Sequence, residues 1–113
     1  MTNKQAEQLL AQAQLYQQQM QSLLTQRNAY NLEMAELKQA AEELDKTKEK
    51  NVYKISGPIL IRHDASEIKD QLEDRLKFLE MRLKVVSDQE DKVKKKIEEL
   101  REKLLGKDDI KVK

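Results

Sequence analysis

The chain has 113 residues, a formal net charge of +1 and 38% charged residues, with two glycines, one proline and no tryptophan. This composition is typical of long helices or coiled coils rather than of a compact globular core. The absence of cysteine excludes disulfides, thiolate metal sites and cysteine nucleophiles. Basic and acidic residues alternate, and no stretch is apolar enough to cross a bilayer. The sequence therefore predicts a cytoplasmic protein that binds neither nucleic acid nor membrane.

Residues 3–47 are predicted to form a first long helix. Thr2 and Gln5 have the spacing of a capping box at its start. Apolar residues then recur at alternating steps of three and four, so they share one stripe of the helix, and this stripe must be covered. The members of this apolar stripe are Ala6, Leu9, Ala13, Tyr16, Met20, Leu23, Arg27, Tyr30, Met34, Leu37, Ala41 and Leu44. Arg27 is its one charged member.

Residues 65–105 are predicted to form a second helix, with Asp64 as its N-cap. Its apolar stripe has the same spacing and consists of Leu72, Leu76, Leu79, Leu83, Val86, Glu90, Val93, Ile97, Leu100 and Leu104. An antiparallel pairing of the two helices covers both stripes. Arg27 and Glu90 then lie at comparable heights, and we expect them to be either a register-setting pair or snorkelling side chains. Residues 106–113 are expected to form a flexible tail.

The segment between the helices, residues 51–62, changes to the pattern of a β-hairpin. β-branched and aromatic residues surround a turn that contains glycine and proline. The residues that we expect to carry assembly through this hairpin are Val52, Tyr53, Ile55, Gly57, Pro58, Ile59, Leu60 and Ile61. A lone two-stranded hairpin is marginally stable in water. Its edges and apolar side chains therefore require other hairpins, most simply in a closed barrel shared between subunits.

Together these elements predict one domain over residues 1–113, dominated by α-helix. The expected fold is a long antiparallel α-helical coiled-coil hairpin, with one β-hairpin at the helix connection that joins an intersubunit β-barrel. A structural coiled-coil scaffold that binds specific protein partners is the alternative; it predicts homodimers and leaves the β-hairpin without a purpose. A DNA-associated coiled coil is a third possibility, which the mixed charge disfavours.

The hairpin segment, residues 52–61, resembles the corresponding segment of prefoldin beta-type subunits. Residues 79–84 and the pair Gln89-Glu90 are similar to the second helix of that family, and residues 16–20 are similar to the first. One hairpin between the helices is the beta pattern, and the organisation looks closest to the archaeal beta subunit. Residues 85–87, Val-Val-Ser, depart from the family, which more often has good helix formers there.

The resemblance implies a heterohexamer of two alpha-type and four beta-type subunits. In that family the hairpins form a double β-barrel platform from which coiled coils project. The tips of the coiled coils bind unfolded proteins and deliver them to a group II chaperonin without ATP. The family's distal ends are implicated in chaperonin docking, which makes Lys103, Lys107, Lys111 and Lys113 candidate contacts here.

Catalytic chemistry has no support in this sequence. The chain has no Gly-rich phosphate loop and no cluster with metal-ligand spacing. Its single histidine, His63, follows the second predicted strand, where a solvated side chain is the simplest interpretation. We therefore expect no enzyme activity, no cofactor and no metal.

Large apolar residues outside the two stripes fall into two groups. The group toward the hairpin is Leu32, Ile68, Phe78, Met81 and Val85, and the group toward the free ends is Leu10, Leu15, Leu24, Leu105, Ile110 and Val112. Scattered apolar residues on a surface are normal. Alternatively, the first group packs against adjacent subunits or under the barrel, and the free ends bind unfolded clients. The expected client-binding tip residues are Leu9, Leu10, Ala13, Leu100, Leu104 and Leu105.

Overall fold

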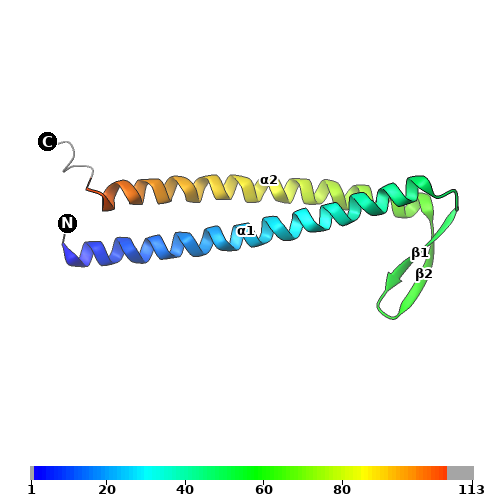
Figure 1. The fold of residues 1–113 in the computed structure, drawn as a ribbon, viewed down its shortest axis with the longest axis horizontal. Coiled ribbons are helices and arrows are strands. Elements are labelled where there is room, and N and C mark those ends of the chain that lie inside the picture. The colour runs from blue at the N-terminus through cyan, green and yellow to red at the C-terminus, as the bar shows by residue number, and fades with distance from the viewer. Residues whose placement is uncertain (1, 107–113) are drawn as a thin grey trace. The chain divides into compact units, whose positions relative to one another are not determined.

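The computed structural model describes residues 2–106 (Figure 1). Its elements are, in chain order, α1 (Asn3–Lys46), β1 (Asn51–Ser56), β2 (Ile59–Asp64) and α2 (Ala65–Leu104). The prediction of two long helices with one β-hairpin between them is confirmed. Each helix ends one residue before its predicted end, and the hairpin extends to Asp64 instead of residue 62. Apart from Gly106, the predicted tail lies outside the described residues.

These elements divide into two compact units. The terminal unit contains residues 2–27 and 84–106, and the hairpin unit contains residues 28–83. Each unit includes one stretch of α1 and one stretch of α2. No helix within residues 2–106 is both long and apolar enough to span a membrane.

The predicted capping box at the start of α1 is present. The Thr2 backbone N–H donates to the Gln5 side-chain oxygen at 2.9 Å, and the Gln5 backbone N–H donates to the Thr2 hydroxyl at 3.2 Å. Two backbone donors at the helix start are thereby satisfied. At the other terminus, Gly106 follows α2 with a φ of +67°, a conformation that glycine adopts without steric cost and that commonly ends helices.

The apolar stripes form the contact between the helices. Every predicted stripe residue is buried or half-buried. In the terminal unit the buried apolar side chains are Leu23, Val86, Val93 and Leu100, and in the hairpin unit Leu79 is completely buried. The spacing of three and four residues explains this pattern, because it keeps each stripe facing its partner helix.

The two charged members of the stripes contact each other in the terminal unit. The Arg27 guanidinium donates a hydrogen bond to the Glu90 carboxylate. Only 4% of Glu90 is exposed, whereas 39% of the Arg27 side chain remains accessible. A carboxylate this deeply buried requires a partner, because its desolvation is costly. Of the two arrangements expected for Arg27 and Glu90, the structure therefore shows the paired one.

Exposed ion pairs connect the helices of the hairpin unit. Arg75 binds Glu33 with two nitrogens, at 2.6 and 3.0 Å, and Lys69 lies 3.2 Å from Asp45. Lys69 comes before Arg75 in α2, whereas its partner Asp45 comes after Glu33 in α1. The two helices are therefore antiparallel here. The Arg75 guanidinium also lies 5.0 Å from the centre of the Phe78 ring, within cation–π range.

The hydrogen bonds from Arg75 lower the pKa of the Glu33 carboxyl below its ordinary value of 4.5. A lowered pKa in the folded state means that the pair stabilises the fold above pH 4.5, where Glu33 is ionised in both states. This contribution is lost as the pH falls through the lowered pKa. Since both side chains are exposed, solvent screening keeps the contribution small.

The strands β1 and β2 form a two-stranded antiparallel sheet. Their register runs from Asn51 opposite Asp64 to Ser56 opposite Ile59, which leaves Gly57 and Pro58 as a two-residue turn. Gly57 has a φ of +58°, and proline fixes the next φ near −65°. This order of signs is that of a type II′ turn, whose twist suits a β-hairpin. Pro58 thus lies at the turn, as its missing N–H requires.

We expect Arg27→Leu to destabilise the protein by about 3 kcal/mol, because it leaves the Glu90 carboxylate buried without a partner. The double variant Arg27→Leu/Glu90→Leu should recover most of this loss, since two leucines continue the apolar stripe. Thermal and denaturant unfolding, followed by circular dichroism at one fixed protein concentration, measures both effects.

The matched control is Arg75→Leu, which removes an exposed partner of Glu33. It should lower the free energy of unfolding much less than Arg27→Leu does, because the Glu33 carboxylate can be solvated. Wild-type stability in Arg27→Leu would contradict the structural role assigned to the buried pair.

Candidate functional site

Apolar side chains cover both faces of the β-hairpin. Residues directly opposite each other in an antiparallel pair share a face. The register therefore places Val52, Ile59 and Ile61 on one face and Tyr53, Ile55 and Leu60 on the other. All are exposed except Val52, which is half-buried, and Ile55 reaches 75%. A hairpin that packed on only one side would alternate apolar and polar residues. This one requires cover on both sides.

The edges of the hairpin are equally unsatisfied. Within residues 2–106 the sheet has two strands, so each strand pairs along one side only. The other side of each strand presents backbone N–H and C=O groups that can bind a further strand. Open edges and two apolar faces together are typical of a surface that is buried by association.

The expected tip residues lie where α1 begins and α2 ends, at the same end of the terminal unit (Figure 1). Leu10 is 57% exposed and Leu105 is 65% exposed. Leu9, Ala13 and Leu104 are half-buried. Leu100 is only 5% exposed, because it belongs to the apolar stripe. A partner can therefore contact Leu10 and Leu105, the two off-stripe leucines, without any separation of the helices.

The other off-stripe residues are also largely exposed. Leu15, Leu24 and Val85 are exposed in the terminal unit, and Leu32, Phe78 and Met81 in the hairpin unit, whereas Ile68 is half-buried. Leu15 and Leu24 extend the apolar surface of α1 beyond its first turns. Ile110 and Val112 lie outside the described residues, as do Lys107, Lys111 and Lys113. Lys103 is exposed near the end of α2.

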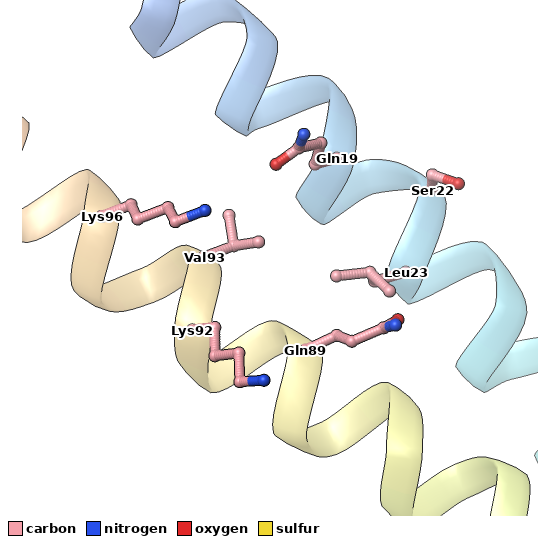
Figure 2. A pocket seen from close by; sticks show the side chains of 7 residues that line it. All are labelled: Gln19, Ser22, Leu23, Gln89, Lys92, Val93 and Lys96. Carbon is pink, nitrogen blue, oxygen red and sulfur yellow. The ribbon is translucent and has the colours of Figure 1, made fainter.

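A groove between α1 and α2 in the terminal unit was not predicted from the sequence. It has a volume of about 320 Å³ and is lined by Gln19, Ser22, Leu23, Gln89, Lys92, Val93 and Lys96. Figure 2 shows Leu23 and Val93 pointing toward each other from the two helices, with a lysine on either side of Val93. The signal that could have revealed the groove is the pair Lys92 and Lys96, one helical turn apart on either side of the stripe residue Val93, opposite a stretch of α1 that is rich in glutamine.

Side chains suited to metal binding do not gather in the part of the chain that the structure describes. No group of three or more His, Asp or Glu residues is placed to hold an ion there. His63 is half-buried, and its Nδ1 lies 3.8 Å from a carboxylate oxygen of Glu67, one helical turn further on.

Comparisons with known proteins agree on one family. The family model described as "Prefoldin subunit" matches residues 7–107. The prefoldin beta subunit of Thermococcus onnurineus is 35% identical to this chain, over 88% of it and 87% of the relative. That of Pyrococcus furiosus is 32% identical, over 88% of this chain and 86% of the relative.

A solved structure extends the similarity to three dimensions. The crystal structure of the prefoldin beta subunit from Thermococcus strain KS-1 superposes with a TM-score of 0.80 at 30% identity. The match covers 88% of this chain and 89% of that one. It therefore includes most of both helices and the β-hairpin. Sequence, family model and fold lead to the same conclusion: the chain belongs to the prefoldin subunit family.

Proposed function

We propose that this chain is a beta-type prefoldin subunit that acts as an ATP-independent holdase and co-chaperone in the cytoplasm. In this function it captures unfolded polypeptides and delivers them to a group II chaperonin. The observation that carries the proposal is the joint presence of a hairpin with two apolar faces and exposed leucines at the ends of the helix pair. The archaeal relatives that are prefoldin beta subunits support it.

Assembly is assigned to the β-hairpin. Hairpins from several subunits would pair edge to edge and close into a barrel, which removes every open edge. One face of each hairpin would then line the interior of the barrel, and the other would pack beneath neighbouring subunits. The proposed assembly is a heterohexamer in which four copies of this chain join two alpha-type subunits.

Client capture is assigned to the tip residues around Leu10 and Leu105. Exposed leucines contact apolar side chains of any unfolded chain without selecting a sequence. Each buried leucine contributes roughly 1.5–3 kcal/mol before the cost of ordering the client. One tip therefore binds weakly, and several tips held on one platform would raise the avidity. Weak individual contacts permit release to a chaperonin without an energy source, and Lys103 is a candidate contact in that transfer.

Replacing Ile59 and Ile61 with lysine should abolish the oligomer, because both residues lie on one face of the hairpin and a charge cannot be buried there unpaired. Native mass spectrometry, with and without a co-expressed alpha-type subunit, measures the loss of assembly directly.

Leu15→Lys/Leu24→Lys is the matched control, since both residues are exposed apolar side chains of α1 that lie in the terminal unit, away from the hairpin and from the residues expected to contact adjacent subunits. This variant should keep most of the assembly. An intact oligomer in the Ile59/Ile61 variant would rule out the assembly role of the hairpin. A purely homodimeric wild type would favour the scaffold alternative.

The variant Leu10→Ser/Leu105→Ser should weaken suppression of client aggregation while the oligomer survives. About tenfold more protein should be needed for half-maximal suppression, because two exposed leucine contacts per subunit are removed. Light scattering of a chemically unfolded client, diluted into the assembled complex, measures this effect. Truncation of residues 1–10 and 105–113 should abolish suppression.

Leu32→Ser is the control for that experiment, because it removes an equally exposed leucine from the hairpin unit. Its suppression of aggregation should match that of the wild type. If the tip variant retained full suppression as an intact oligomer, client capture at the tips would be excluded.

A further inference from the structure

In the terminal unit, the positions of α2 directly beside the apolar stripe carry basic residues and no acidic residue. The basic residues at these positions are Lys94, Lys96, Arg101 and Lys103, whereas Lys84, Lys92 and Lys95 occupy outer positions of the heptad. The acidic residues, apart from Glu90 in the stripe itself, occupy the outer positions of the heptad: Asp88, Asp91, Glu98, Glu99 and Glu102. In a coiled coil, residues beside the stripe usually pair with opposite charges on the partner helix.

The partner helix offers almost no such charges. Residues 2–27 of α1 contain one acidic residue, Glu7, and many glutamines. Within residues 2–106, none of the ion pairs involves Lys92 or Lys96, and the buried Glu90 is bound by Arg27. The cations beside the groove are therefore available to a ligand.

The groove combines these cations with an apolar floor. Leu23 and Val93, which form the floor, are 7% and 8% exposed. Gln19 and Gln89 come from opposite helices and lie toward opposite ends of the groove, with Leu23 between them, and Lys96 reaches toward Gln19 (Figure 2). The volume of about 320 Å³ is at the lower limit of small-ligand sites, which suits one or two side chains of a peptide.

We propose that this groove is a second client contact, selective for unfolded segments in which an apolar side chain is flanked by carboxylates. The proposal rests on the proposed holdase function and adds a chemical preference to it. The apolar side chain packs on Leu23 and Val93. The carboxylates lie near the Lys92 and Lys96 ammonium groups, and the glutamine amides bond to the extended peptide backbone.

Charge complementarity favours this occupant over a neutral or basic segment. Lys92 and Lys96 are the charged residues among those that line the groove, so a basic segment would meet two like charges there and be repelled. Both lysines are exposed, so their attraction is modest and is screened by salt. Such a contact biases which part of a client binds while leaving release possible.

Three short fluorescent peptides with the same apolar residues, flanked by glutamate, glutamine or lysine, test the proposal on the assembled complex. Fluorescence anisotropy should show that wild type binds the glutamate peptide about five- to tenfold more tightly than the glutamine peptide at low ionic strength. Lys92→Gln/Lys96→Gln should remove this difference, and Lys92→Arg/Lys96→Arg should retain it.

Lys84→Gln/Lys95→Gln is the matched control, because it removes the same charge from two exposed lysines of the same unit that do not line the groove. It should retain the preference for glutamate. Equal affinity of the wild type for all three peptides would overturn the proposal. A control that lost the preference for glutamate as fully as Lys92→Gln/Lys96→Gln would overturn it too.

Failure of the groove and failure of the holdase function are distinguishable in the same preparations. Loss of the glutamate preference in Lys92→Gln/Lys96→Gln, with unchanged suppression of aggregation of a client poor in acidic residues, supports a separate charge-selective contact. A wild-type complex that suppresses no aggregation would refute the holdase function, whatever the peptide affinities. A glutamate preference that disappears in Leu10→Ser/Leu105→Ser but persists in the groove variant would assign it to the tips instead.

Discussion

The pairing of two narrow apolar stripes is the constraint on which every other feature depends. Each helix has apolar residues on one face only, and neither helix is stable in water with that face exposed. The pairing buries residues such as Leu79 and Val86, and it brings Arg27 to the buried Glu90. An ion pair in an apolar contact contributes little net stability compared with two leucines. Its value lies in the register, since a shifted alignment would leave the carboxylate buried and unpaired.

Once the stripes are paired, the remaining apolar residues define what the protein presents to others. The hairpin cannot bury its own side chains, because two strands offer no interior. Its open edges and both faces therefore require neighbours. The exposed leucines at the tips are different, since they lie beside a stripe that is already covered. Association through the hairpins can bury a large area and be permanent, whereas two leucines per tip support only weak and reversible contacts.

The sequence predicted the fold well, because the features that determine it are local or periodic. A repeat of three and four residues identifies the stripes, and Gly57 followed by Pro58 identifies the turn. Features that depend on side chains from two helices were harder to predict from the sequence. The burial of Leu100 contrasts with the exposure of Leu105, although both were expected at the tips. The two-nitrogen ion pair between Arg75 and Glu33 depends on how far long side chains reach across the helix contact, and so does the groove beside Val93.

The difference between tip and groove follows from where each lies relative to the apolar stripes. Leu10 and Leu105 stand outside the stripes, so they offer apolar area and no fixed charge. Beside Val93 the stripe itself forms the floor, and two lysines line the groove: Lys96 from a position that flanks the stripe, and Lys92 from one position further out. Replacement of the glutamines of α1 by glutamate would neutralise these lysines across the helix contact and strengthen the pairing. The stretch of α1 in the terminal unit, which is poor in charge, thus forgoes that stabilisation, and the groove lysines stay available for the proposed contact with carboxylates.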